Sequence, residues 1–157
     1  MSLAAKTSGS TASEKAFIFA PTAADWIETI PGEKMLFRVR SSEVGGRYAV
    51  LETIAAPGSA SPEHFHKEDE VFQVLSGTMT FKLGDEIISA HAGATVVIPA
   101  GVPHCWKNKS SGEVRMLATF TPGGVEALFE RLSSVQPEDI PAFAAGFGTI
   151  VVGPPLD

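Results

Sequence analysis

Three of the four histidines in this chain form a pattern with a glutamate that could bind a metal ion. His64 and His66 are two residues apart, so in an extended segment both side chains lie on one face while Phe65 points away. Glu70 follows four residues after His66, and His104 comes much later, after a turn rich in proline and glycine. If the fold brings them together, three imidazoles and one carboxylate would make a site for a divalent transition metal.

Each of these residues also has a plainer interpretation when it is taken alone. A His-x-His pair in a polar loop is usually a pair of surface histidines, and an acidic run such as the one containing Glu70 is usually solvated. His104 alone would be a half-buried residue with satisfied hydrogen bonds. The metal hypothesis therefore depends on the segments that position the four side chains.

Glycine and proline interrupt the chain every ten residues or so and separate short segments rich in valine, isoleucine, phenylalanine and threonine. This pattern predicts an all-β sandwich or barrel made of many short strands. A helix over residues 125–132 follows from apolar positions spaced i, i+3, i+4 and i+7, and a second short helix is expected over 138–144. The expected strands are 16–20, 35–40, 48–55, 70–75, 79–83, 86–90, 95–98, 104–108, 114–121 and 149–152.

Two spaced motifs, separated by fifteen residues, carry a family resemblance. Their ten positions are Gly58, His64, His66, Glu70 and Gly77, then Gly93, Pro99, Gly101, His104 and Asn108. At all ten positions the chain resembles the signature of the cupin superfamily. The resemblance implies a small jelly-roll barrel, the cupin double-stranded β-helix, with a short C-terminal helical segment. It also implies that His64, His66, Glu70 and His104 bind one metal ion, whereas Asn108 is expected to be a structural hydrogen-bond partner.

The donor set leaves the identity of the metal open among Fe, Mn, Ni, Co, Zn and Cu. In an octahedral shell, three nitrogens and one oxygen leave two positions, which a substrate and O2 could occupy. The chain is similar to single-domain cupins that resemble quercetin dioxygenase, and it shares with them the Thr-Pro-Gly-Gly segment at 121–124 and a Gly-Pro-Pro tail.

This similarity implies an oxidoreductase, a dioxygenase acting on a small hydroxylated or aromatic compound. Glu70 would be a metal ligand only or, in addition, a catalytic general base. The alternatives are an isomerase or decarboxylase that uses the metal only as a Lewis acid, and a non-catalytic barrel that binds a small molecule.

Alternation along the strands indicates which side chains accompany the ligands. The expected substrate pocket includes Phe72, Met79, Phe81 and Trp106, unless these side chains only fill the barrel. Cys105 should point to the opposite face of its strand as a small core residue, and His91 should be exposed. Three arginines in or beside strands are expected on a solvated face rather than against a substrate carboxylate: Arg38, Arg40 and Arg115.

Composition excludes several classes of protein. Twelve basic against eighteen acidic side chains give a net charge of -6, which argues against nucleic-acid binding. A single cysteine excludes an internal disulfide framework. Neither a membrane-spanning stretch nor a secretory signal is recognisable, so a cytoplasmic location is expected.

One domain is expected over residues 16–157, with its core at 35–121 and a C-terminal helix and tail at 122–157. Residues 1–15 are expected to be a disordered tail or a cloning remnant. Because exposed sheet edges favour pairing between copies, we also expect a homodimer, with residues 16–20 or 149–152 as an exchanged or added strand.

Overall fold

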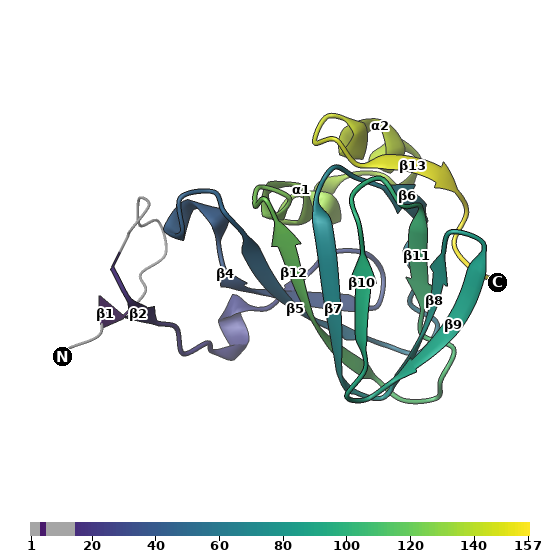
Figure 1. Ribbon diagram of the computed structural model, residues 1–157, viewed down its shortest axis with the longest axis horizontal. Helices are drawn as coiled ribbons and strands as arrows, with labels where there is room; N and C mark the ends of the chain where they lie inside the picture. The colour runs from purple at the N-terminus through teal and green to yellow at the C-terminus, as the bar shows by residue number, and fades with distance from the viewer. Residues whose placement is uncertain (1–3, 6–14) are drawn as a thin grey trace.

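Two antiparallel sheets face each other in the computed structural model, which describes residues 4–5 and 15–157 (Figure 1). The six-stranded sheet has the order β10 (Thr95–Ile98), β7 (Asp69–Ser76), β12 (Val114–Thr121), β5 (Ala49–Ala55), β4 (Glu33–Val39), β3 (Ile27–Glu28). The five-stranded sheet has the order β13 (Ile150–Gly153), β6 (Glu63–Phe65), β11 (His104–Lys107), β8 (Thr78–Leu83), β9 (Glu86–His91). The all-β prediction is confirmed.

The core lies between the sheets, and the long strands β12 and β7 show this most clearly because they bury alternate side chains. In β12 the buried positions are Val114, Met116, Ala118 and Phe120, and the residues between them are partly or fully exposed. β7 alternates in the same way, and its inward face carries Glu70 together with Phe72. A carboxyl group is thereby carried into a largely apolar core.

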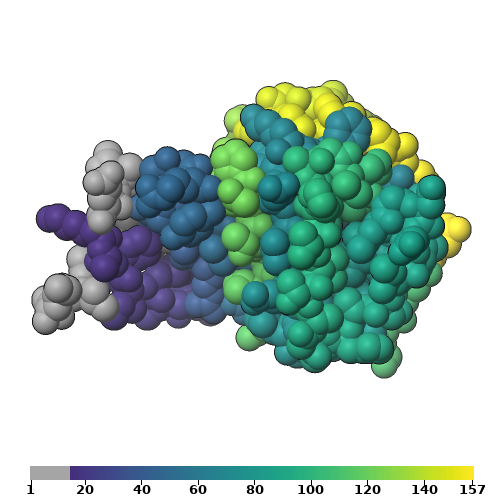
Figure 2. Space-filling view, in the orientation of Figure 1, coloured from purple at the N-terminus to yellow at the C-terminus, as the bar shows by residue number. Residues whose placement is uncertain are grey.

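Short helical segments and the C-terminal strand cover one end of the barrel (Figure 2). They are α1 (Glu126–Phe129), α2 (Ile140–Ala145) and the 3-10 turns Leu132–Ser134 and Pro137–Asp139. The helix predicted over residues 125–132 is shorter than expected. After Phe129 the chain leaves the α-helix and continues into the 3-10 turn Leu132–Ser134. Within the described residues, no helix is long and apolar enough to cross a lipid bilayer.

The N-terminal part lies beside the barrel at one side (Figures 1 and 2). The strand predicted over 16–20 is reduced to β2 (Phe17–Ile18), which pairs in parallel with β1 (Ala4–Ala5). Two 3-10 turns follow, at Ala23–Asp25 and Ser41–Glu43. The tail predicted for residues 1–15 falls mostly outside the described residues. β3 and β6 are not among the predicted strands, because two or three residues are too few to show alternation.

Gly77 joins β7 to β8 at a place where no side chain fits. Its φ is 81°, and a Cβ there would lie 2.9 Å from the carbonyl oxygen of Glu113. We expect Gly77→Ala to lower the free energy of unfolding by about 2–3 kcal/mol, because the variant combines a left-handed backbone with a clash. Urea denaturation measures this change. Gly84→Ala is the matched control, since Gly84 has φ 59° with nothing within 4 Å of its Cβ position. If both variants lose the same free energy of unfolding, the clash with Glu113 does not contribute.

Candidate metal centre

The candidate ligands come from both sheets. His64 on β6 and His104 on β11 are directly opposite each other in the antiparallel pairing, so their side chains share one face. His66 comes immediately after β6, and Glu70 lies on β7 in the other sheet. The three residues between His66 and Glu70 therefore carry the chain from one sheet to the other, and the site lies where the sheets approach each other.

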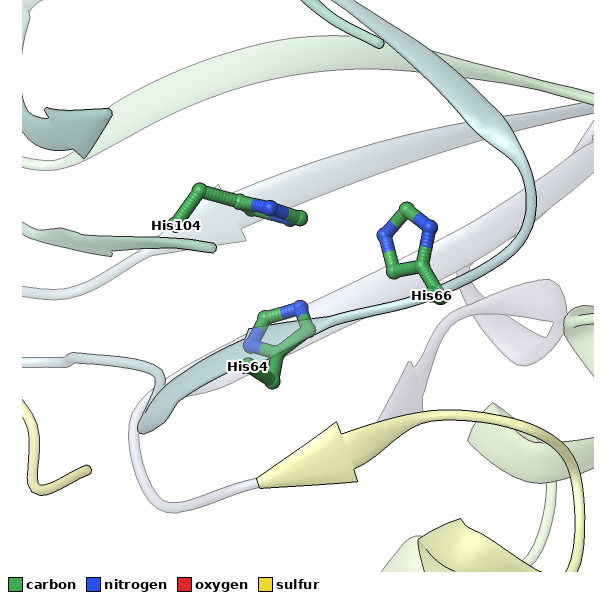
Figure 3. Close-up of side chains that lie close together, drawn as sticks. All are labelled: His64, His66 and His104. Atoms are coloured by element: carbon green, nitrogen blue, oxygen red, sulfur yellow. The ribbon is translucent and has the colours of Figure 1, made fainter. Parts of the chain in front are cut away.

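The structure brings the four predicted ligands together. The ligand atoms of His64, His66 and His104 all lie within 4.8 Å of one another, and the rings point toward a common centre (Figure 3). Oε2 of Glu70 is 3.0 Å from Nε2 of His66 and 3.1 Å from Nε2 of His104. His66, Glu70 and His104 are buried, and His64 is partly buried.

Backbone carbonyl groups fix the orientation of each imidazole. The Nδ1 atoms lie 2.7, 3.0 and 2.8 Å from the carbonyl oxygens of Pro62, Glu68 and Val102, for His64, His66 and His104 respectively. Because a carbonyl oxygen can only accept, each Nδ1 carries a proton and donates it. Nε2 is therefore the atom of each ring that can bind a metal, and an ion there would take the place of the proton that Nε2 of His66 or His104 otherwise donates to Glu70.

Burial and neighbouring groups shift the pKa values at the site. Burial lowers the pKa of His64 to about 4, and the nearby His104 adds to this effect. Burial would raise the pKa of Glu70, but hydrogen bonds from His104 and His66 outweigh it and bring the pKa to about 2. Burial would lower the pKa of His66, but its hydrogen bond and charge interaction with Glu70 outweigh burial and raise that pKa. The carboxylate is therefore ionised and attracts a cation.

The spacing and the donors fit a divalent transition metal. Two donors that are each about 2.1 Å from one ion, at right angles, lie about 3.0 Å apart. The contacts of Glu70 Oε2 with the two Nε2 atoms have this length, at 3.0 and 3.1 Å. Nitrogen and carboxylate donors of this kind suit Fe, Mn, Ni, Co, Zn or Cu. The binding of an ion by these four residues remains a prediction.

Glu68 is a further part of the site that the sequence does not single out. Its side chain is 3% exposed, and its Oε2 lies 3.5 Å from Nδ1 of His66 without a hydrogen-bond partner among the described residues. A carboxylate behind a histidine ligand orients the ring and makes it a better donor. Only its place two residues after His66 could have suggested this role.

We expect Glu68→Gln to weaken metal binding about 10-fold, because it removes a negative charge beside Nδ1 of His66. Competition with a chromophoric chelator measures the affinity. Glu86→Gln is the control, since Glu86 is exposed on β9 and its replacement changes the net charge equally. Equal affinities in the two variants would show that Glu68 does not act on His66.

A cavity of about 100 Å³ adjoins the candidate ligands, with room for several water-sized groups. Its lining includes His64, His66, Glu70 and His104, and most of the remaining wall is apolar. Of the predicted pocket residues, Phe72 and Trp106 line the cavity.

The prediction that Met79 and Phe81 line the pocket is corrected by the structure. Both are buried in the core, at 0% and 1% exposure, and neither is part of the cavity wall. On β8, Leu83 is paired with His104, Phe81 with Trp106, and Met79 lies further along. Alternation places these side chains on the inward face, but it does not show how far along the barrel they lie from the ligands.

The other residues considered from the sequence lie away from the cavity. Asn108 is fully buried, and its Nδ2 donates to the carbonyl oxygens of Ala55 and Gly112, which confirms a structural role. Cys105 is buried and His91 is exposed, both as predicted. The three arginines form ion pairs: Arg38 and Arg115 with Glu52, and Arg40 with Glu130.

Two cavity residues, Glu33 and Thr53, were not predicted. Glu33 is 5% exposed and Thr53 is 4% exposed. A signal for Glu33 exists in the sequence, since Glu33, Met35 and Phe37 alternate along β4 and share its buried face. The alternation of Thr53 with Leu51 and Ala55 on β5 carries a similar signal.

Known proteins resemble the central part of this chain. The cupin domain family matches residues 51–120. An acireductone dioxygenase from Sulfurihydrogenibium sp. (strain YO3AOP1) is 33% identical over 82 residues, which are 49% of this chain and 46% of that protein. An uncharacterized protein of Streptomyces coelicolor, SCO3923, is 34% identical over 65 residues, which are 41% of this chain and 61% of that protein. The matches thus span less than two thirds of either relative.

Solved structures share the fold at low sequence identity. KdgF from Halomonas sp. superimposes with a TM-score of 0.59 at 17% identity, covering 66% of this chain and 90% of that one. A Cupin 2 conserved barrel domain protein from Salinispora arenicola CNS-205 also gives 0.59, at 21% identity, covering 76% of this chain and 98% of that one. The four candidate ligands fall inside residues 51–120, which match the cupin domain family, and the two facing sheets have the fold of these barrels; the chain therefore contains a cupin domain at residues 51–120.

Proposed function

We propose that this chain is a metal-dependent oxidoreductase, a dioxygenase that acts on a small hydroxylated or aromatic compound. The observation that carries the proposal is the convergence of three imidazoles, each held by a backbone carbonyl, with one carboxylate at the wall of an apolar cavity. The likeness to an acireductone dioxygenase supports the reaction class, over 46% of that protein.

The residues of the site would have two roles, metal binding and exclusion of water. His64, His66, Glu70 and His104 would hold the ion, and the apolar walls around Phe72 and Trp106 would exclude water from the reacting groups. When bound, the metal would supply Lewis acidity and, if redox active, a route for electrons between substrate and O2. The pKa of Glu70, lowered to about 2 although burial opposes this, makes its carboxylate a weak proton acceptor. We therefore assign Glu70 as a ligand rather than as the general base.

An oxygen electrode tests the proposal directly. The full chain is loaded separately with Fe(II), Mn(II), Ni(II), Co(II), Zn(II) and Cu(II), its metal content is measured by elemental analysis, and a flavonol, a catechol and an enediol are offered. We expect substrate-dependent O2 uptake with at least one redox-active metal and none with Zn(II). The His104→Ala variant, treated with the same salts, is the control.

The same experiment separates the alternatives. If the substrate is turned over at the same rate with and without O2, the dioxygenase proposal is overturned and a Lewis-acid isomerase or decarboxylase is favoured. Metal-dependent binding without turnover would favour a non-catalytic barrel. Among the described residues that line the cavity there is no lysine or arginine, so a substrate phosphate or carboxylate would meet only the metal and the histidines there.

The homodimer remains a proposal as well. β13 pairs with β6 of its own chain. The outer strands β10 and β9 carry the exposed apolar side chains Val97 and Ile87, which are 62% and 61% exposed and could be covered by a second copy. Light scattering at micromolar concentration would show a mass of twice 16.5 kDa if the proposal holds.

A further inference from the structure

We propose that Glu33 and Thr53 form a polar subsite that binds a hydroxyl or carbonyl oxygen of an uncharged, otherwise apolar substrate. This inference rests on the proposed function in one respect, namely that a substrate enters the cavity beside the four candidate ligands. It adds a recognition site on the β4 and β5 strands, which carry none of those ligands.

The two side chains are neighbours on one wall of the cavity. In the β4–β5 pairing, Glu33 is opposite Ala55 and Met35 is opposite Thr53, so Glu33 and Thr53 are diagonal neighbours. Diagonal side chains on one sheet face are about 7–8 Å apart at the backbone and reach each other through their ends. Both line the same cavity as His64, His66 and Glu70. A single oxygen-bearing group of a ligand can therefore contact both.

An unsatisfied hydroxyl points to a missing partner at this place. Thr53 is 4% exposed, and its Oγ1 is buried without a hydrogen-bond partner in the described part of the chain. Thr149 also lines the cavity, and its Oγ1 is likewise buried without a hydrogen-bond partner among the described residues. Buried polar groups are nearly always paired, so two unpaired hydroxyls in one cavity favour a ligand or water that bonds them.

Glu33 supplies a hydrogen-bonding group held in place. The Thr29 hydroxyl donates to Oε1 of Glu33 and fixes the carboxyl group. Burial raises the pKa of Glu33 to about 7, although the bond from Thr29 lowers it, and the charge of Glu70 raises it slightly further. A substantial fraction of the group is therefore protonated near neutral pH and can donate to a ligand oxygen.

The charges around the cavity select an uncharged ligand. The acidic side chains in its wall are Glu33 and Glu70, and no lysine or arginine of the described residues lines it. An anionic group near Glu33 would be repelled by the Glu70 carboxylate and would find no lysine or arginine among the described residues of the wall. The aromatic walls, which include Phe72, Trp106 and Phe120, suit an apolar or aromatic body.

Phenol and toluene test the subsite, because they have nearly the same shape and differ in one hydroxyl. The full chain is loaded with Zn(II), which is not redox active, and dissociation constants are measured by ligand-detected NMR. We expect Glu33→Met and Thr53→Val each to shift the ratio of the two constants about tenfold toward toluene, since each removes one hydrogen bond to phenol. Glu33→Gln, which keeps a donor and an acceptor, should retain most of the wild-type ratio. Thr80→Val, a buried threonine on β8 outside the cavity, is the control and should leave the ratio unchanged.

Each other outcome overturns the proposal. The proposal fails if the ratio is unchanged in both cavity variants, if phenol does not bind to the wild type, or if benzylammonium binds more tightly than phenol. The measurement needs no O2 and no turnover, so failure of the dioxygenase proposal would leave this ratio unaffected. Conversely, substrate-dependent O2 uptake together with an unchanged phenol-to-toluene ratio in the variants would overturn the subsite proposal and leave the dioxygenase proposal standing.

Thermal unfolding of Thr53→Val without added ligand separates a binding role from a structural one. Removing an unpaired buried hydroxyl while keeping the side-chain shape should raise Tm by about 3 °C. A lower Tm would show that the hydroxyl stabilises the fold, and it would overturn the assignment of Thr53 to the subsite.

Discussion

Replacing His104 by alanine is expected to weaken divalent-metal binding by more than about 100-fold while the barrel stays folded. His104 is 1% exposed, its Nδ1 is fixed by the carbonyl of Val102, and its Nε2 is 3.1 Å from Oε2 of Glu70. Removing a residue that only supports a ligand usually weakens metal affinity 10- to 100-fold, so removing the ligand itself should weaken it further. The remaining donors, His64, His66 and Glu70, would still bind an ion weakly.

The fold should tolerate this change because His104 lies at the end of β11, next to a cavity. We expect a loss of roughly 1–3 kcal/mol in the free energy of unfolding, the range usual for a buried substitution. Elemental analysis after dialysis and circular dichroism measure the two effects. His91→Ala is the matched control, since His91 is exposed on β9 and its ring contacts only Thr78 among the hydrogen bonds described. Equal metal contents in the two variants would refute the assignment of His104.

The longer strands could be predicted from the sequence because alternation is a local rule, whereas the grouping of the four ligands came from the resemblance to the cupin motifs. Alternation defines the buried face of β12 and β7, and the two-residue spacing of His64 and His66 places both rings on one face. The spacing motif then connects His104, 38 positions after His66, to the same site. In the structure His104 is opposite His64 in the β6–β11 pairing.

Depth along the barrel could not be predicted in the same way. Phe72 and Phe81 both point inward and their ring centroids are 5.3 Å apart, yet only Phe72 lines the cavity. The difference depends on register between strands, which alternation within one strand does not contain. For Glu33, too, the sequence predicts the buried face but not the position in the cavity. Its inward position is readable from β4, but its place in the same cavity as Glu70 depends on how the sheets close around the cavity.

Glu33→Gln is expected to make the protein more stable than the wild type at high pH but not at low pH. Burial raises the pKa of Glu33 to about 7 from an ordinary value of 4.5, despite the opposing bond from Thr29. Between these two values the folded protein holds a proton that the unfolded chain has lost, so the wild type becomes less stable as the pH rises. The shift corresponds to about 3 kcal/mol, which the wild type loses between about pH 4.5 and pH 7 and the variant keeps.

Urea denaturation of both proteins from about pH 4 to pH 8 measures the difference, and groups that titrate in both proteins cancel from it. Glu126→Gln is a control of opposite sign. Burial would raise the pKa of Glu126, but hydrogen bonds from Ser41 and Gly124 outweigh burial and lower it. The wild type should therefore exceed that variant in stability at neutral pH and lose this advantage as the pH falls below about 4.5. A Glu33→Gln difference that does not change with pH would mean that the pKa of the carboxyl group is the same in the folded and unfolded states, so the group would be ionised at neutral pH and the cavity would then favour a cationic ligand.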